Sequence, residues 1–440
     1  VNNTGYVKAL SFNRTRSIPT SPQEKNRVVC YIQSWAYHRK GKGLFVPENI
    51  EPTICTHIIY AYATIKDFYI RPFIRYEESE PWREGLFQRL VNNKEINPGL
   101  NVMVAVGGAD GDKYIERMPE NEANLKSFAI NAVKFLREKE FDGLEVTWER
   151  PTVTHKQKFL IILKHLREAF DQEATQSGKT RLILTVSMPA GKEKIDVYGR
   201  DLLTIERTVD FMSVRTYDFH GSWESHTGLN SPLYEANYES VENRQLNMDW
   251  VGRYYFSMGV SKRNMNLGIP TYARSYTLQD PTNNAVYAQV TGPGKPGQFT
   301  GTPGLLAYYE VCDFLTLGAQ VVDVPEQRVP YAHGEDQWVS FESLDSVIEK
   351  ACYISQLRFG GVNIWALDLD DFMGLSCEQG KFPLVATVYN IVQYIDTTKC
   401  SNFLIMRATG GAGERGQPCQ HFKYMNMMLV LVLVAYSAFH

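Results

Sequence analysis

The feature that most limits how this chain can fold is a series of eight short apolar segments separated by helical patterns. In order they are VVCYIQSW, HIIYAYATI, NVMVAVGG, GLEVTWE, LILTVSMPA, FMSVRTYD, NLGIPTYAR and GVNIWALD. Residues 121–140 and 156–170 between them place apolar side chains at helical spacing. Near-continuous apolar strands that alternate with amphipathic helices indicate a parallel sheet with both faces covered. We therefore predict an α/β fold, a (β/α)₈ TIM barrel, with a doubly wound open sheet as the alternative.

The domain limits follow from where this alternation is interrupted. The stretch at about 275–350, between the seventh and eighth strands, is rich in Gly, Pro and Tyr and too long for one helix with its loops. We expect it to form a small α+β insertion beside the barrel mouth. The barrel is expected to span 27–395, after a polar, disordered leader at 1–26 and before a tail at 396–440.

Composition narrows the classes of partner. The chain has 440 residues, 44% of them hydrophobic, and a net charge of -3 with both signs interspersed. Without a basic face, nucleic acid and anionic membranes are poor partners, whereas neutral ligands such as sugars remain open. The seven cysteines lack the CxxC spacing of a metal site, which leaves scattered thiols or disulfides.

Both ends of the chain carry short motifs for covalent modification that would apply if the protein is secreted. Asn2 and Asn13 begin glycosylation sequons in the polar leader. Near the C-terminus, the apolar run 427–435 is shorter than the roughly 20 residues that span a bilayer. It follows small residues at 410–413 and a polar spacer, the layout of a cleaved signal for a lipid anchor. A final β-strand or a hydrophobic tail is the alternative.

The segment FDGLEVTWERP, residues 141–151, is the strongest candidate for chemistry. Glu145, Thr147 and Glu149 alternate with apolar residues, so in an extended strand their side chains share one face. Two carboxylates facing a cavity suggest acid–base catalysis, and an edge strand with a solvated face is the alternative. No histidine stands at ligand spacing, so we expect no metal and no cofactor.

Polar and aromatic residues also gather at the ends of the other predicted strands, where the chemistry of (β/α)₈ barrels takes place. They are Trp35, Glu149, Tyr217, Asp218, Tyr272, Arg274 and Trp365. Several aromatic rings around one mouth indicate a groove, because aromatic faces stack on the C–H faces of pyranose rings. His57, on an apolar strand, is expected to be a core residue rather than a ligand.

These residues carry a family resemblance. FDGLEVTWERP resembles the D-x-x-D-x-D-x-E strand of glycoside hydrolase family 18, the chitinases and chitinase-like lectins. Further segments, found in family order, cover about 27–395: CTHIIYAYA, VAVGG, RTYDFHGSWE, TGLNSPLY, LGIPTYARSY, GLLAYYEVC and FGGVNIWALDLDDF. The resemblance implies a barrel with an insertion before its last strand and the disulfides Cys30–Cys55 and Cys312–Cys377, hence secretion.

The resemblance also implies catalytic roles, which this sequence fills only in part. Family members use a substrate-assisted mechanism, an exception to the usual pair of catalytic carboxylates. Glu149 matches the proton donor and Asp142 the first acidic position, but Thr147 replaces the Asp that assists the substrate's acetamide. A hydroxyl carries no charge to offset the developing cation, a loss of about 10²–10³-fold in turnover. Glu145 replaces the next Asp inward.

Other departures point the same way. Ala109 stands where the family has a sugar-stacking Trp, and Arg150 and Arg215 replace a Tyr and a Met. Either arginine could pair with Glu145 or Glu149, which would favour the ionised form of a carboxyl that must be protonated to act as an acid.

Much of the binding surface that the resemblance implies is retained. The matching positions are Trp35, Gly107, Gly108, Tyr217, Asp218, Trp223, Tyr272, Arg274 and Trp365. We therefore predict a secreted chitinase-like protein that binds chitin or N-acetylglucosamine oligomers in an extracellular matrix with little or no hydrolysis. The alternatives are a slow family 18 chitinase that uses Glu149 as proton donor, and a secreted signalling scaffold.

Overall fold

The structure is a computed structural model of the chain. It describes residues 26–108, 111–118, 121–149, 152, 155–394 and 400, and of Asp112 and Tyr114 only the backbone. Several sequence predictions lie outside these residues: the leader with Asn2 and Asn13, Ala109, Arg150, and the tail with Cys419 and its apolar run.

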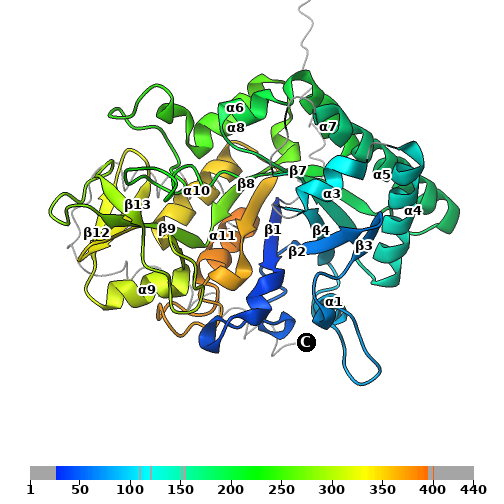
Figure 1. The fold of residues 1–440 in the computed structure, drawn as a ribbon, viewed down its shortest axis with the longest axis horizontal. Helices are drawn as coiled ribbons and strands as arrows, with labels where there is room; N and C mark the ends of the chain where they lie inside the picture. Colours follow the sequence, from blue (N-terminus) through cyan, green and yellow to red (C-terminus); the bar gives the residue numbers. More distant parts are fainter. Residues whose placement is uncertain are drawn as a thin grey trace, which may run out of the picture.

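Eight parallel strands form a closed barrel (Figure 1). They are β1 (Arg27–Gln33), β2 (His57–Lys66), β4 (Asn101–Gly107), β5 (Gly143–Thr147), β6 (Ile183–Met188), β7 (Phe211–Val214), β8 (Met265–Pro270) and β15 (Gly361–Trp365). β1 pairs with β15 on one side and with β2 on the other, which closes the sheet. The predicted (β/α)₈ barrel is confirmed, and the open sheet is wrong.

Helices connect the barrel strands and follow the last one. The α-helices are α1 (Leu86–Val91), α2 (Asn93–Ile96), α3 (Asp112–Arg117), α4 (Glu122–Glu138), α5 (Lys156–Ser177), α6 (Lys192–Asp196), α7 (Leu202–Thr208), α8 (Met248–Ser257), α10 (Leu344–Gln356) and α11 (Pro383–Tyr394). The 3₁₀ helices are η1 (Ser34–His38), η2 (Gly41–Gly43), η3 (Pro47–Asn49), η4 (Arg75–Glu77), η6 (Gly199–Asp201), η7 (Asn243–Gln245), η8 (Lys262–Asn264) and η9 (Leu367–Leu369). In α4 the side chain of Asn121 caps the N-terminus, and Leu125, Phe128 and Leu136 bury one face.

A second, antiparallel sheet lies between β8 and β15 in the chain, at the left of Figure 1. Its elements are β9 (Tyr272–Leu278), β10 (Val290–Pro293), β11 (Leu305–Ala307), α9 (Tyr308–Thr316), β12 (Gln320–Val324), β13 (Val329–Gly334) and β14 (Gln337–Ser340). It has a hydrophobic cluster of its own around Tyr276, Tyr331 and Trp338. The predicted insertion between the seventh and eighth barrel strands is confirmed, with its sheet running from Tyr272 to Ser340. A short strand, β3 (Tyr69–Arg71), pairs with the end of β2.

Three disulfides join secondary-structure elements to segments that are distant in the sequence. Cys30–Cys55 joins β1 to the segment before β2, and Cys312–Cys377 joins α9 to the segment after β15, as the family resemblance implied. A third bond, Cys352–Cys400, fastens α10 to Cys400. The sequence left the partners of these last two cysteines open.

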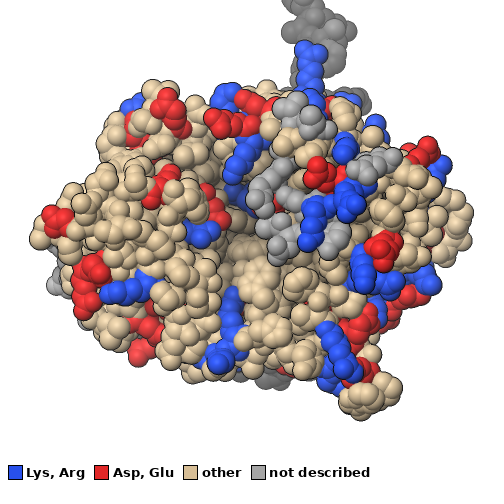
Figure 2. All heavy atoms as spheres, viewed as in Figure 1, with Lys and Arg blue, Asp and Glu red and all other residues tan. Residues whose placement is uncertain are grey.

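The visible face of the molecule mixes both signs of charge around a central hollow (Figure 2). No helix in the described part of the chain is long and apolar enough to cross a bilayer. Within the same residues, no three His, Cys, Asp or Glu side chains are grouped so that they could hold a metal ion.

Candidate active site: a cleft at the barrel mouth

A cleft of about 1060 Å³ opens at the C-terminal ends of the barrel strands. Each of the eight strands contributes a lining residue that lies in it or within two residues of its end. These residues are Trp35, Tyr62, Gly107, Glu149, Pro189, Arg215, Tyr272 and Trp365. The cleft therefore occupies the position at which barrels of this kind carry their chemistry.

The middle of β5 points into the barrel and not into solvent. Glu145 and Thr147 have no exposed surface, and β5 is paired with β4 and with β6. The alternative of a solvated edge strand is therefore wrong. Both oxygens of Glu145 accept hydrogen bonds from the Tyr31 hydroxyl at 2.8 Å, and one accepts a bond from Thr185 at 3.2 Å.

Burial raises the pKa of Glu145 to about 7, and the hydrogen bonds from Tyr31 and Thr185 lower it in part. Thr147 lies above Glu145, with its hydroxyl 3.5 Å from the nearer carboxylate oxygen. Neither side chain is among the lining residues of the cleft. The interior of β5 thus places no carboxylate in the lining of the cleft.

Glu149, two residues beyond the end of β5, does line the cleft. Its carboxylate forms an ion pair with the guanidinium of Arg215, which directly follows β7. The side chains are 25% and 19% exposed, respectively. Burial opposes the charge on Arg215, but the neighbouring Glu149 more than offsets that cost and keeps the pKa of Arg215 above its ordinary value. Of the pairings considered from the sequence, the structure shows that of Arg215 with Glu149.

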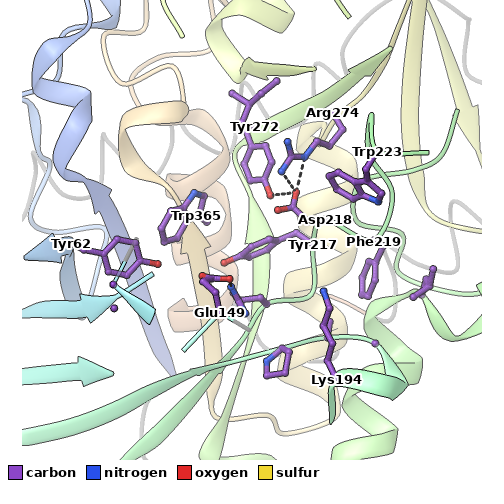
Figure 3. A pocket seen from close by; sticks show the side chains of 18 of the residues that line it. Tyr62, Glu149, Lys194, Tyr217, Asp218, Phe219, Trp223, Tyr272, Arg274 and Trp365 are labelled. Atoms are coloured by element: carbon purple, nitrogen blue, oxygen red, sulfur yellow. Dashed lines mark hydrogen bonds and ion pairs between the residues drawn. The ribbon is translucent and has the colours of Figure 1, made fainter. Parts of the chain in front are cut away.

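The opposite side of the cleft is built around the carboxylate of Asp218 (Figure 3). It accepts hydrogen bonds from the Tyr272 hydroxyl at 2.5 Å and from Nε of Arg274 at 2.8 Å. The backbone of Asp218 adopts a φ of 57°, and its N–H donates to the Asn230 side chain at 3.0 Å. The ring of Tyr217 lies 6.1 Å from that of Tyr272. The structure therefore brings the predicted Tyr217, Asp218, Tyr272 and Arg274 together.

Three tryptophans complete the lining. Trp365 lies at the floor, with its ring 5.2 Å from Tyr31 and 6.2 Å from Tyr62 (Figure 3). Trp35 and Trp223 are 45% and 59% exposed, and the guanidinium of Arg274 lies 5.2 Å from the ring of the latter. Open aromatic faces around a concave site suit the apolar faces of sugar rings.

The two glycines after β4 allow close packing at the floor. Gly107 has a φ of +108°, and a Cβ there would lie 1.8 Å from the carbonyl oxygen of Thr147. Gly108 has a φ of +74°, and a Cβ there would lie 2.8 Å from the ring of Tyr62. Gly107 lines the cleft, whereas Gly108 lies beside the ring of Tyr62 and is not among the lining residues.

Asp142 is the one predicted catalytic residue that the structure does not bring to the cleft. It precedes β5, at the end of the strand away from the cleft, and five extended residues span about 16 Å. Its carboxylate accepts hydrogen bonds from Lys94 at 3.0 Å and from the Val102 N–H at 2.7 Å. We therefore correct its role: Asp142 fastens the base of the barrel, and its place in the family motif does not make it catalytic.

His57 is a core residue, as expected. It lies at the start of β2, at the same end of the barrel as Asp142, with Nδ1 2.9 Å from the Thr56 hydroxyl. Burial lowers the pKa of His57 to about 3.

Sequence reasoning missed some lining residues. Tyr62 sits in an apolar strand, where its alternation with buried neighbours looks like ordinary core, and only its place near the strand end signals the cleft. Lys194 belongs to the short helix α6 and points into the cleft opposite Trp223 (Figure 3). Phe73 reaches the cleft from the long connection after β3.

Comparison with curated proteins identifies relatives over most of the chain. Chitotriosidase-1 of Mus musculus is 37% identical over 368 residues, which cover 82% of this chain and 77% of that protein. Chitinase-3-like protein 2 of Homo sapiens is 36% identical over 365 residues, which cover 82% of this chain and 91% of that protein.

Solved structures show the same architecture. Human YKL-39, described as a pseudo-chitinase with retained chitooligosaccharide binding properties, superposes with a TM-score of 0.79 at 34% identity, covering 83% of this chain and 99% of that one. The immunomodulatory active chitinase of Trichuris suis gives a TM-score of 0.81 at 30% identity, covering 84% and 100%. The family model for Glycosyl hydrolases family 18 matches residues 27–370, so this chain belongs to glycoside hydrolase family 18.

Proposed function

We propose that this protein is a secreted, chitinase-like protein that binds chitin or N-acetylglucosamine oligomers with little or no hydrolysis. The observation that carries the proposal is the composition of β5 and its surroundings. A buried hydroxyl, that of Thr147, occupies the place of the assisting carboxylate, and the candidate proton donor Glu149 is tied to Arg215.

The first deficit concerns the substrate's acetamide. In the substrate-assisted route, a carboxylate beside the acetamide takes its N–H proton and stabilises the positive charge that develops as the carbonyl attacks. Thr147 can accept one hydrogen bond but supplies no charge, and Glu145 behind it has a pKa of about 7 because it is buried. Removing one preorganised group of this kind typically lowers turnover by about 10²–10³-fold.

The second deficit concerns the proton donor. A general acid must hold a proton within reach of the leaving oxygen. The Glu149 carboxylate is held in an ion pair with Arg215 in a partly buried place, so it must leave this contact before it can approach a leaving oxygen. The two deficits affect different parts of the reaction, so the factors by which each lowers turnover are expected to multiply.

Sugar binding does not depend on either group. The floor retains Trp365, and Tyr217 and Asp218 lie beside it. Tyr272 and Arg274 hold the Asp218 carboxylate through its Oδ1 atom, and a carboxylate has about four lone-pair sites, so it can still accept a bond from a sugar hydroxyl or amide. Human YKL-39, a pseudo-chitinase of the same family, retains chitooligosaccharide binding, which supports the proposal.

Three disulfides favour an oxidising compartment and hence an extracellular location. A protein that binds chitin without cleaving it would remain attached to the polymer. We therefore propose a role in an extracellular matrix that contains chitin. A lipid anchor at the C-terminus remains a prediction that lies outside the described residues.

Two measurements test the proposal. We expect retention of the wild-type protein on insoluble chitin at low salt and a clear loss of retention in Trp365→Ala. We also expect turnover of a fluorogenic chitobioside to be at least about 10²-fold below that of an active family 18 chitinase. If neither the wild-type protein nor Trp365→Ala were retained on insoluble chitin, the proposal that the protein binds this sugar would be wrong.

A slow family 18 chitinase is the second candidate, because Glu149 is present and its side chain reaches the cleft. Wild-type turnover within tenfold of an active chitinase would favour it over the binding function.

A further inference from the structure

One wall of the cleft carries more positive than negative charge. It is built by residues 111–113 after β4, Glu149 after β5, residues 189–194 after β6 and Arg215 directly after β7, and these four strands are neighbours in the sheet. The charged lining residues of this wall are four cations and two carboxylates: Lys113, Lys192, Lys194, Arg215, Glu149 and Glu193. We call it the basic wall, and Figure 2 shows lysine and arginine side chains beside the central hollow.

The rest of the lining only partly offsets this charge. Asp218 and Arg274, on the opposite side of the cleft, form an ion pair with each other. Glu242, in the long connection after β7, is the other lining carboxylate, and it is exposed to solvent. Among the described lining residues, positive charge therefore remains in excess, although the chain as a whole is close to neutral.

Lys194 is the cation of the basic wall that is most open to a ligand. It belongs to α6, is exposed, and points into the cleft (Figure 3). Among the residues that the structure describes, no Asp or Glu forms an ion pair with it. Its neighbour Lys192 differs, because it pairs with Asp196 and its Nζ lies 5.5 Å from the centre of the Tyr254 ring. The ammonium of Lys194 is therefore available to an anion that enters the cleft.

Arg215 supplies further donors beside Lys194. Nη1 of Arg215 donates a hydrogen bond to the Glu149 carboxylate. A guanidinium has several N–H donors in a planar fork, so this bond leaves others for a second anion. The Arg215 side chain is 19% exposed and lines the cleft. Because β6 and β7 pair in parallel, the segments that carry Lys194 and Arg215 leave neighbouring strands at the same end of the barrel.

We propose that the cleft prefers an N-acetylglucosamine chain that carries anionic groups, either carboxylate or sulfate, and that Lys194 determines this preference together with Arg215. The inference rests on the proposed function and names the class of polymer. Charge-assisted hydrogen bonds to an anionic oxygen are stronger than bonds between neutral groups, and a cleft lined by one sign of charge concentrates ligands of the opposite sign. The family resemblance places a Met at position 215, so this cation is a departure of this chain.

Three tetrasaccharides with one backbone test the preference. They are chitotetraose, its 6-O-sulfated derivative, and its derivative oxidised to a carboxylate at C6. Isothermal titration gives the ratio of the dissociation constant of chitotetraose to that of each derivative, and a ratio is insensitive to general effects on sugar binding. For wild type we expect a ratio of at least about 5 for one or both derivatives at low salt, falling toward 1 at about 0.5 M NaCl, because salt screens exposed charges.

Variants of Lys194 assign the preference to its charge. Lys194→Met keeps a long side chain without the charge and should lower the wild-type ratio at least about threefold, whereas Lys194→Arg should retain it. Lys164→Met is the matched control, since it removes one charge from an exposed position on α5 outside the cleft lining. We expect this control to keep the wild-type ratio.

Two results would contradict the inference. One is a wild-type ratio of 1 or less for both derivatives, and the other is a wild-type ratio that persists in Lys194→Met. A gain for both derivatives supports a general preference for anionic chains, and a gain for one alone supports the preference and identifies the group. Failure of the proposed function is a different result, because the wild-type protein would then bind none of the three tetrasaccharides.

Discussion

Glu149 and Arg215 form an ion pair across the floor of the cleft, one residue following β5 and the other following β7. The pair places a cation beside the only carboxylate of the β5 motif that reaches the cleft. Because of this pair and the buried Thr147, the barrel mouth has the shape of a glycosidase site but lacks the assisting carboxylate and carries an added cation. The consequences can be measured.

Restoring both missing features is expected to restore hydrolysis. In Thr147→Asp/Glu145→Asp the assisting carboxylate returns, and adding Arg215→Met releases Glu149 from its ion pair. We expect the triple variant to turn over a fluorogenic chitobioside about 10²–10³-fold faster than wild type, and the double variant to fall between them. Adding Glu149→Gln should abolish the gain. A triple variant no faster than wild type would show that the loss of activity has another cause.

Trp365→Ala is expected to weaken chitooligosaccharide binding through the loss of the stacking floor. The aromatic contact is worth about 0.5–1.5 kcal/mol beyond the area it buries, so the dissociation constant should rise roughly tenfold once the lost area is included. Isothermal titration with chitotetraose measures it. Leu317→Ala, at an 87% exposed position outside the cleft lining, is the control and should bind as wild type does. If Trp365→Ala bound chitotetraose as tightly as wild type does, the sugar would not contact Trp365.

Stability is expected to fall with rising pH because of Glu145. Burial raises its pKa from the ordinary 4.5 to about 7. Below 4.5 the carboxyl is protonated in both the folded and the unfolded chain, whereas between 4.5 and 7 the unfolded chain releases the proton that the folded chain keeps. The free energy of unfolding therefore decreases over this window, by about 2 kcal/mol between pH 5 and 8.

Glu145→Gln carries no titratable proton and isolates this effect. Urea unfolding of the two proteins at pH 5 and pH 8 should show a smaller decrease in the variant, by about the same 2 kcal/mol. Parallel decreases in both proteins would contradict the raised pKa of Glu145.

Asp142→Asn is expected to separate stability from binding. The substitution removes the charge that holds Lys94 and weakens the bond from the Val102 N–H, a loss of about 1–2 kcal/mol in the free energy of unfolding. Affinity for chitotetraose should not change, since Asp142 lies at the base of the barrel. A loss of affinity without a loss of stability would return Asp142 to the binding site.

The architecture could be predicted because it depends on patterns spread along the chain. Apolar strands buried on both faces, with amphipathic helices between them, have few solutions other than a covered parallel sheet. The resemblance to family 18 placed the insertion and two disulfides. The motif FDGLEVTWE also aligned Glu145, Thr147 and Glu149 on one face, because side chains alternate along a strand whatever the partner strands are.

Several features of the site depended on which strands become neighbours in space. Alternation along β5 could not say that Asp142 lies at the far end of the barrel from Glu149, since that depends on where the strand begins and on which end opens to solvent. It could not show that Tyr62, a residue of an apparently ordinary core strand, faces Trp365.

The sequence alone determined that a hydroxyl, and not a carboxylate, stands at position 147, since side-chain chemistry does not change on folding. Only the tertiary structure decided that Arg215 pairs with Glu149 and that Cys352 meets Cys400. The physical reason is that the partners in these two contacts are 48 and 66 positions apart in the sequence. They come within bonding distance only when the barrel has closed.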